Sequence, residues 1–165
     1  MKTVYIVRHA KSSWEFPQLE DHERPVIPKG VRRTERVIEF LRERTIKVDL
    51  LYASHAVRSA ETARMLAPAV DVEPHRIITE PEIYHGGTSA LTHLIYSLPD
   101  DAEAVMIVGH NPAVTDFANE YSDEYIDWLP TSAVVALRFD TNHWSEIDEA
   151  KVTTRFIITP SMLKN

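Results

Sequence analysis

Three short segments of the chain combine histidine and arginine with small residues in a pattern that could carry chemistry. The segments are Arg8-His9-Ala10-Lys11, Ser54-His55-Ala56-Val57-Arg58 and Gly109-His110-Asn111-Pro112. A neutral imidazole is a nucleophile, and a phosphoryl group attached to it can be removed by water. Guanidinium and imidazolium donors can hold the three oxygens of a transferring phosphoryl group without a metal ion. Two histidines and two arginines brought to one place would therefore suit phosphoryl transfer through a phosphohistidine.

Each of these residues also has an ordinary structural explanation. A single histidine after a buried strand more often belongs to the core or to a turn than to an active site. Arg58 could make a surface ion pair worth ~0–1 kcal/mol, and Lys11 and Arg24 could be solvated charges. Arg8 differs, because an arginine beside an apolar run must find a partner or be buried at a cost. Their joint occurrence at successive strand ends favours a functional interpretation.

The elements that would position these residues alternate between strand and helix patterns. Apolar runs predict strands at 3–7, 50–53, 76–79, 104–108 and 133–139. Helical spacing of apolar residues predicts helices after Pro28 and over 54–67, 91–98 and 114–121. The alternation predicts an α/β three-layer sandwich with a mostly parallel central sheet and helices on both faces. Residues 133–158 contain strands without a helix between them, which predicts one antiparallel edge strand or a hairpin.

The three segments follow the first, second and fourth predicted strands. Ligands in such folds bind beyond the carboxyl ends of the strands, so these segments are expected to meet there. Asn111 and Pro112 are a favourable N-cap and first helical residue, which would aim helix amide groups at the strand end. Ser54 is likewise a candidate cap for the helix that carries Arg58.

Length and composition exclude several classes of protein. With 165 residues, of which 44% are apolar and 26% charged, the chain fits one globular domain over 1–165. The absence of cysteine excludes disulfides, a thiolate nucleophile and cysteine-ligated metal sites. No apolar run could span a bilayer, and the run at 4–7 is too short for a signal peptide. We therefore expect a cytoplasmic protein without a membrane partner.

Sequence patterns give no indication of a metal ion or a cofactor. None of the eight histidines forms an H-x-x-x-H or H-E-x-x-H pair. The chain also has no Walker loop, no G-x-G-x-x-G and no G-x-S-x-G elbow. We expect no cofactor and no metal, although distant residues could still assemble a metal site in three dimensions.

The charges are unevenly distributed along the chain. The net charge of −7 argues against nonspecific nucleic-acid binding, which needs a basic surface. Residues 1–66 nevertheless carry 13 Lys and Arg against 9 Asp and Glu, whereas residues 67–165 carry 5 against 16. This asymmetry is either chance clustering on solvated faces or a local anion site in an acidic protein.

Taken in order, the three segments resemble the motifs of the histidine phosphatase superfamily, whose fold is phosphoglycerate-mutase-like. Val7-Arg8-His9-Ala10 is similar to the Arg-His-Gly motif of that superfamily, with alanine in place of the commoner glycine. The second and third motifs are matched by Ser54-x3-Arg58-x3-Thr62 and Gly109-His110-Asn111-Pro112. Further segments resemble the small bacterial SixA-like phosphohistidine phosphatases: Arg8-His9-Ala10-Lys11-Ser12, Asp21-x-x-Arg24-Pro25, Pro81-Glu82-Ile83-Tyr84 and Pro130-Thr131-Ser132.

This resemblance implies a role for four residues of the motifs. It implies that His9 is the nucleophile that becomes phosphorylated. It also implies that Arg8, Arg58 and His110 form the phosphate pocket together with His9.

Three more residues are candidates at the margin of that pocket. Larger relatives use a Glu or Asp after the third strand as proton donor, and Glu82 is the position that best matches. The alternative for Glu82 is a surface glutamate beside a turn. Lys11 and Arg24 are candidates for the substrate rim, although the loop that carries Arg24 could be a solvated connection.

The size of the chain bears on the substrate. Larger relatives insert long segments that roof the pocket, whereas here only residues 83–103, partly helical, separate Glu82 from the next strand. We therefore expect no lid subdomain and an open pocket that admits a phosphorylated side chain of a folded partner. Phosphohistidine suits such a site because its imidazole leaving group has a pKa near ~6.5 and needs little protonation. A mutase is disfavoured because it needs an enclosed site.

The predicted function is a metal-independent phosphatase that forms a phosphohistidine on His9 and dephosphorylates phosphohistidine on a partner protein, acting as a monomer. Two alternatives stay open: a phosphomonoesterase for a small phosphate ester, and a catalytically silent phosphate-binding module. The intact nucleophile and phosphate pocket argue against the silent module.

Overall fold

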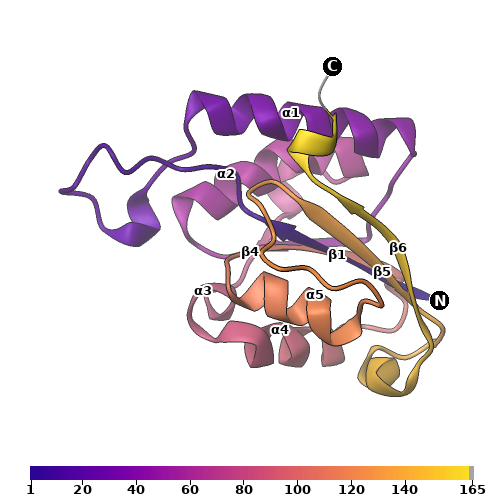
Figure 1. The fold of residues 1–165 in the computed structure, drawn as a ribbon. Coiled ribbons are helices and arrows are strands. Elements are labelled where there is room, and N and C mark those ends of the chain that lie inside the picture. The colour runs from indigo at the N-terminus through magenta and orange to yellow at the C-terminus, as the bar shows by residue number, and fades with distance from the viewer. Residues whose placement is uncertain (164–165) are drawn as a thin grey trace.

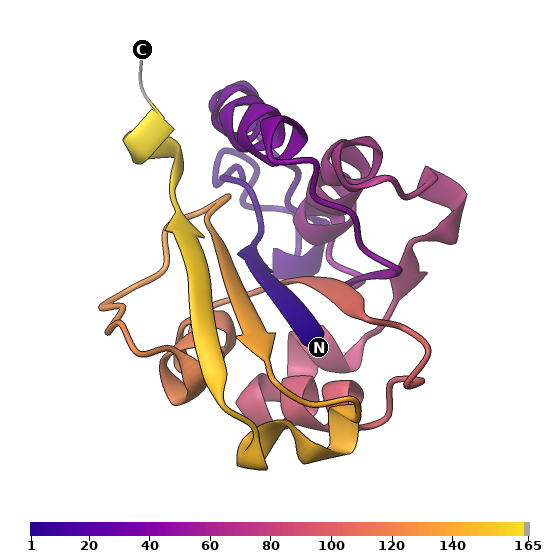
Figure 2. The same ribbon diagram turned by 90° about the vertical axis from the view of Figure 1, so that its right-hand side faces the viewer.

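Six strands form one mixed sheet in the computed structural model, which describes residues 1–163; the last two residues of the predicted domain lie outside this range. The strands are β1 (Lys2–Arg8), β2 (Leu50–Ala53), β3 (Ile78–Thr79), β4 (Ala104–Gly109), β5 (Val134–Phe139) and β6 (Val152–Ile158). Their order is β3-β2-β4-β1-β5-β6, with parallel pairing from β3 to β1. β5 pairs antiparallel with both β1 and β6. The mostly parallel sheet with antiparallel pairing at one edge is confirmed, and yellow β6 is the outermost strand there (Figure 2).

Helices cover both faces of this sheet. They are α1 (Pro28–Glu43), α2 (Val57–Leu66), α3 (Glu82–His85), α4 (Gly87–Tyr96) and α5 (Ala113–Tyr121). Short 3₁₀ turns occur at Asp21–Glu23, Ala67–Val70, Pro74–Arg76, Trp144–Glu149 and Pro160–Leu163. α1 and α2 lie on one face and α3, α4 and α5 on the other, which confirms the three-layer architecture (Figure 1). Within residues 1–163 the structure contains no helix with the length and apolar character needed to cross a membrane.

The central strands are buried on both faces because their apolar runs are nearly continuous. On β1, Val4 and Ile6 enter the core that α4 and α5 cover. Tyr5 and Val7 enter the second core, under α1 and α2. Successive side chains of a strand point to opposite faces, so one apolar run supplies both layers.

The helix α2 and the strand β3 begin later than the sequence predicts. α2 has Ala56 at its N-cap, and Ser54 does not cap it. The hydroxyl of Ser54 lies instead 2.6 Å from Nε2 of the half-buried His110 and accepts the backbone N–H of Ala56 at 3.3 Å. β3 is shortened because the 3₁₀ turn Pro74–Arg76 takes up the start of the predicted strand.

The sheet topology brings the three motif segments together. β4 lies between β1 and β2, and Arg8 at the end of β1 pairs with Gly109 at the end of β4. α5 begins at Ala113, one residue later than expected. Its N-cap is Pro112 and not the predicted Asn111, and Pro112 makes no side-chain capping hydrogen bond. Oδ1 of Asn111, one residue earlier, accepts the backbone N–H of Thr115 at 3.2 Å.

Candidate active site

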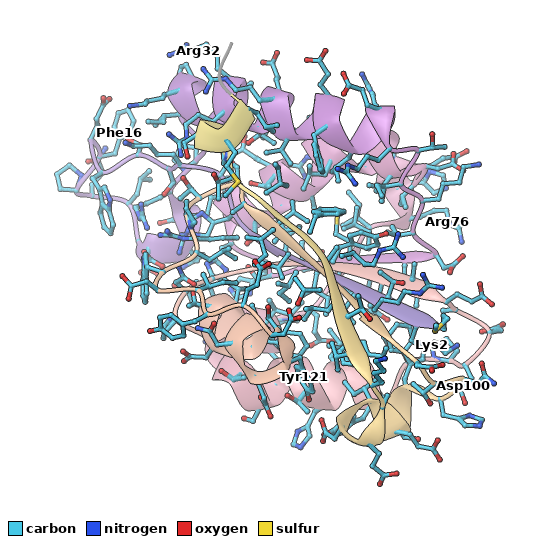
Figure 3. All side chains as sticks on the ribbon, turned by 45° about the vertical axis from the view of Figure 1, so that its right-hand side comes forward. Lys2, Phe16, Arg32, Arg76, Asp100 and Tyr121 are labelled. Atoms are coloured by element: carbon cyan, nitrogen blue, oxygen red, sulfur yellow. The ribbon has the colours of Figure 1, made fainter. Side chains whose placement is uncertain are left out.

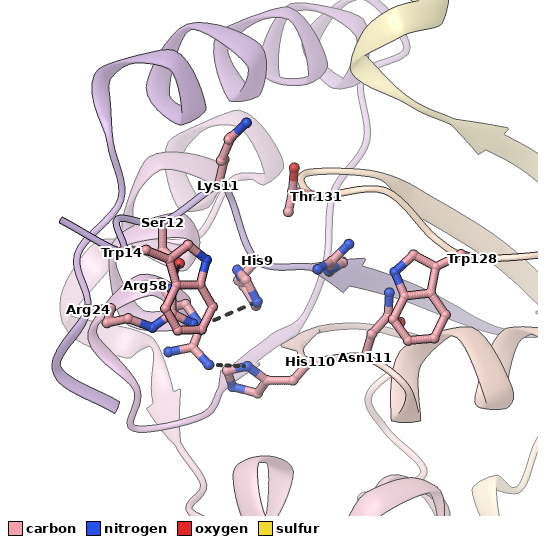
Figure 4. Close-up of a pocket in the computed structure, with 11 residues that line it drawn as sticks. His9, Lys11, Ser12, Trp14, Arg24, Arg58, His110, Asn111, Trp128 and Thr131 are labelled. Atoms are coloured by element: carbon pink, nitrogen blue, oxygen red, sulfur yellow. Dashed lines mark hydrogen bonds between the residues drawn. The ribbon is translucent and has the colours of Figure 1, made fainter. Parts of the chain in front are cut away.

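A cavity of about 410 Å³ opens where β1 and β4 end (Figure 4). It is lined by Arg8, His9, Lys11, Ser12, Trp14, Arg24, Arg58, His110, Asn111, Trp128 and Thr131. These residues include arginines and a lysine but no aspartate or glutamate, so the cavity suits an anion. The structure thus brings six of the seven predicted site residues to one cavity, and only Glu82 lies elsewhere.

The imidazole of His9 is held in one tautomer. Nδ1 lies 2.8 Å from the carbonyl oxygen of Ala10, which can only accept, so Nδ1 carries the proton. Nε2 accepts the Nε–H of Arg58 at 3.3 Å (Figure 4). The loop is fixed in turn by the backbone N–H of Ala10, which donates to Oγ1 of Thr62 at 2.9 Å. The unprotonated Nε2 is therefore the atom of His9 that is available to attack phosphorus.

The electrostatic surroundings keep His9 neutral. Its pKa is lowered to about 4, mainly by burial. The hydrogen bond to the Ala10 carbonyl opposes this shift, and the charges of three cavity arginines, Arg58 foremost, add to it. A neutral imidazole retains the lone pair that a nucleophile needs, and the lowered pKa leaves His9 neutral at neutral pH.

His110 stands beside His9, with ring centroids 5.0 Å apart. Its Nδ1 lies 3.4 Å from Nη2 of Arg58, and its Nε2 lies 2.6 Å from the hydroxyl of Ser54. Because Arg58 can only donate, Nδ1 accepts and Nε2 carries the proton. Burial, followed by the charges of His9 and Arg58, lowers the pKa of His110 to about 3.

Arg8 has unused hydrogen-bonding capacity. Its Nη1 donates to the carbonyl oxygen of Leu129 at 3.1 Å, whereas its buried Nε has no partner within residues 1–163. Burial, followed by the charge of Arg58, lowers the pKa of the Arg8 guanidinium. A buried cation with an unsatisfied N–H is costly unless an anion pairs with it. An oxyanion in the cavity would relieve this cost.

Arg58 is held by Asp21, a residue to which the sequence reasoning gave no role. The Nη1 of Arg58 donates to the Asp21 carbonyl oxygen at 2.6 Å, and Nη2 donates to Oδ2 at 2.9 Å. Tyr84 also donates to Oδ2, at 2.6 Å, while Arg24 donates to Oδ1. Partial burial tends to raise the pKa of Asp21. The hydrogen bonds from Tyr84, Arg58 and Arg24 lower that pKa by more, so the carboxylate stays charged. The Asp21-x-x-Arg24 spacing was the sequence signal that could have found it.

The two rim candidates differ in their surroundings. Arg24 is only 7% exposed, and its guanidinium stacks 3.5 Å above the ring centre of Trp14. It also donates to the hydroxyl of Ser12 at 2.6 Å. Lys11 lines the cavity as well but is exposed. Arg24 is therefore part of the cavity wall, whereas Lys11 lies at its mouth.

Glu82 is not brought together with the other predicted residues. It is exposed and lines a separate depression of about 350 Å³ with residues of α4. The α3 side chain that reaches the His9 site is Tyr84, whose ring centre lies 5.1 Å from that of His110. Residues two apart on a helix point in nearly opposite directions, so α3 can present Tyr84 or Glu82 to the cavity but not both.

The cavity has the donor set of an oxyanion site. Guanidinium N–H groups and imidazoles suit phosphate-like oxygens, whereas divalent cations prefer clustered carboxylates and histidines. Across residues 1–163, no group of three or more His, Asp or Glu is placed to hold a metal ion.

Comparisons of the sequence find relatives that extend over most of the chain. Residues 4–93 match the family model described as Histidine phosphatase superfamily (branch 1). An uncharacterized chloroplastic protein of Arabidopsis thaliana is 30% identical over 157 residues, which cover 88% of this chain and 70% of the relative. An uncharacterized protein of Mycobacterium tuberculosis is 26% identical over 153 residues, covering 86% and 92%.

Two solved structures share the fold. The protein histidine phosphatase SixA complexed with tungstate matches with a TM-score of 0.81 at 18% identity, over 98% of this chain and 99% of that one. A protein from Agrobacterium tumefaciens that also carries the name SixA matches with a TM-score of 0.80 at 22% identity, over 96% and 98%. The predicted SixA-like, phosphoglycerate-mutase-like architecture is confirmed.

Proposed function

This chain belongs to the histidine phosphatase superfamily (branch 1) and is a phosphatase, and we propose that it removes phosphate from phosphohistidine on a partner protein. The reaction would pass through a phosphohistidine on His9 and would need neither a metal ion nor a cofactor. We further propose that the chain acts as a monomer in the cytoplasm.

The proposed reaction has two steps. First, Nε2 of His9 attacks phosphorus while the bond from phosphorus to the substrate imidazole breaks, and the departing imidazole nitrogen takes up a proton from solvent water. Second, water attacks the phosphorus of phospho-His9, the bond to Nε2 breaks, and inorganic phosphate leaves with neutral His9 restored. Arg8 and Arg58 would hold the non-bridging oxygens in both steps, and His110 would join them by donating from Nδ1, since a bound phosphoryl group favours the protonated imidazolium.

The observation that carries this proposal is the state of His9 inside the cavity. Its Nδ1–H is committed to the Ala10 carbonyl, so Nε2 is left as an acceptor beside Arg58. The cavity wall supplies positive charge and no carboxylate. A neutral nucleophile surrounded by fixed cations is the arrangement that in-line attack on a phosphoryl group requires.

Two features support phosphohistidine as the substrate. Because no carboxyl group lines the cavity, an alkoxide leaving group would lack an obvious proton donor there, whereas imidazole with a pKa near ~6.5 leaves readily. Residues 83–103 contribute only the rest of α3, the helix α4 and short connections, so this segment contains no inserted lid subdomain. The fold is also that of a protein named a protein histidine phosphatase.

The test compares two substrates and two histidine variants. Wild type, His9→Ala and the control His75→Ala, which changes an exposed histidine away from the cavity, are incubated in EDTA with a ³²P-phosphohistidyl protein and with p-nitrophenyl phosphate. We expect rapid release of phosphate from the phosphoprotein, slow hydrolysis of the ester, and loss of both in His9→Ala alone. Acid-labile ³²P should remain on wild type after rapid quenching and be absent from His9→Ala.

Other outcomes would select an alternative. If p-nitrophenyl phosphate is the better substrate by tenfold or more, the chain is a phosphomonoesterase and the phosphohistidine assignment is wrong. If wild type hydrolyses neither the phosphohistidyl protein nor p-nitrophenyl phosphate, the chain is better explained as a catalytically silent phosphate-binding module. If EDTA abolishes turnover, the proposed metal independence is wrong.

A further inference from the structure

A basic surface runs along the outer side of α1. Lys29, Arg32, Arg33 and Arg36 alone line a depression of about 460 Å³, which we call the α1 basic face. Spacings of three and four residues place all four on one side of the helix. None of them makes an ion pair within residues 1–163. Figure 3 shows Arg32 projecting outward from α1.

The α1 basic face works against the stability of its own helix. Like charges three and four residues apart repel each other, and a basic residue in the first turn opposes the helix dipole. The first turn of α1 contains Lys29 and no acidic residue. The Nε of Arg33 is buried and has no hydrogen-bond partner in the described part of the chain. Positive charge that is left without an ion pair among residues 1–163 is available to a negatively charged partner.

The first turn of α1, which carries Lys29 of the basic face, packs against Lys11, a residue that lines the cavity. Gly30 packs so closely on Lys11 that a Cβ at Gly30 would lie 2.5 Å from the Lys11 carbonyl oxygen. The backbone N–H of Ile27 donates to the same oxygen at 3.0 Å. Lys11 in turn lines the cavity. Since a helix rises 1.5 Å per residue, the basic face extends for roughly 10 Å from Lys29 to Arg36.

We propose that the α1 basic face docks an acidic surface of the protein that carries the phosphohistidine. This inference rests on the proposed function and adds the chemistry of the partner: when the phosphoryl group enters the cavity, acidic side chains beside it meet α1. A protein suits this face better than a nucleic acid, because the chain as a whole carries a net charge of −7 and would repel an extended polyanion.

Three synthetic peptides of equal length test the proposal. Each carries one phosphohistidine, flanked on both sides by Glu, by Gln or by Lys. At low ionic strength we expect wild type to hydrolyse the Glu peptide with a kcat/KM about tenfold or more above that of the Gln peptide, and the Lys peptide most slowly. The ratio of Glu to Gln peptide should fall toward 1 in about 0.5 M NaCl, because salt screens exposed charges.

Two double variants with the same change in net charge locate the effect. Arg32→Glu/Arg36→Glu should reduce the ratio to about 1 or below. Lys47→Glu/Lys151→Glu changes exposed residues outside the α1 basic face and should preserve the ratio. The docking proposal would be overturned if wild type hydrolysed the Glu and Gln peptides with nearly equal kcat/KM. It would also be overturned if both double variants lowered the ratio of these two kcat/KM values equally.

Binding of fluorescent, unphosphorylated peptides separates this proposal from the proposed function. If no phosphohistidyl peptide is hydrolysed, yet the Glu peptide binds wild type more tightly than Arg32→Glu/Arg36→Glu, the proposed function fails and the docking surface is supported. If the Glu and Gln peptides bind alike, the docking surface fails. Tighter binding of a single-stranded oligonucleotide of equal charge would replace the protein partner with a nucleic acid.

Discussion

Asp21 holds Arg58 through two hydrogen bonds, from Nη1 to its carbonyl oxygen at 2.6 Å and from Nη2 to its carboxylate at 2.9 Å. The Nε–H of Arg58 donates to Nε2 of His9, and Nη2 also lies 3.4 Å from Nδ1 of His110. The carboxylate also accepts hydrogen bonds from Arg24 and Tyr84. One residue of the loop between β1 and α1 thereby fixes two cavity arginines, and it couples that loop to α2 and α3.

Asp21→Asn should lower kcat/KM about tenfold for any phosphorylated substrate. The variant loses charge-assisted hydrogen bonds, each worth about 1.5–3 kcal/mol where well formed, and partial exposure of Asp21 reduces that contribution. Arg58 would then orient less well toward the transferring phosphoryl group. Steady-state kinetics measure the loss, and Glu15→Gln, an exposed acid in the same loop, is the control. Unchanged kinetics in Asp21→Asn would show that Arg58 positions itself without this contact.

His9 and His110 should remain neutral over the physiological range in the ligand-free protein. Their pKa values of about 4 and about 3 lie below the ordinary value, so their imidazole NMR signals should not titrate between pH 8 and about 5.5. His143 should titrate above its ordinary pKa, because Asp100 raises it. A midpoint above pH 6 for His9 would contradict the neutral nucleophile.

The same shifts predict acid sensitivity of the fold. Below pH ~6.5 the unfolded chain takes up protons on these two histidines that the folded protein does not bind until the pH approaches 4. The free energy of unfolding should therefore fall as the pH is lowered through that window. Urea denaturation at several pH values measures the slope, which should be shallower in His9→Asn/His110→Asn. An equal slope in both proteins would assign the acid sensitivity to other groups.

Thr62→Val should destabilise the loop that carries His9, the proposed nucleophile. Oγ1 of Thr62 accepts the backbone N–H of Ala10 at 2.9 Å in a buried setting, and an unsatisfied buried donor costs about 1–3 kcal/mol. We expect a comparable loss in the free energy of unfolding, together with a lower kcat. Thr62→Ser keeps the hydroxyl and should retain more of the activity. Activity in Thr62→Val equal to that of Thr62→Ser would exclude this role for the hydroxyl.

Glu82→Gln should leave kcat within about twofold of wild type on a phosphohistidyl substrate. Glu82 lines a depression outside the His9 cavity, and the imidazole leaving group needs little assistance from an acid. The pH dependence of kcat provides the measurement, with Glu80→Gln as the matched control from the same depression. A loss of tenfold or more confined to Glu82→Gln would establish Glu82 as a proton donor.

The sequence alone determined the layered fold and the position of the reactive residues. Apolar runs and helical spacing are local patterns, and the placement of ligands at the carboxyl ends of parallel strands follows from topology. These rules were sufficient to bring Arg8, His9, Arg58 and His110 to one place. The resemblance to a known superfamily then assigned their roles.

Only the tertiary structure decided which loop residues complete the cavity and which tautomer and charge His9 adopts. Asp21 meets Arg58 across 37 positions of sequence, and Arg8 meets the carbonyl of Leu129 across 121. Glu82 lies outside the cavity that His9 lines, and this position depends on how the short helix α3 is rotated on the sheet. Such contacts join loops that local periodicity does not describe. They form only when packing of the whole sheet and its helices fixes where each loop lies.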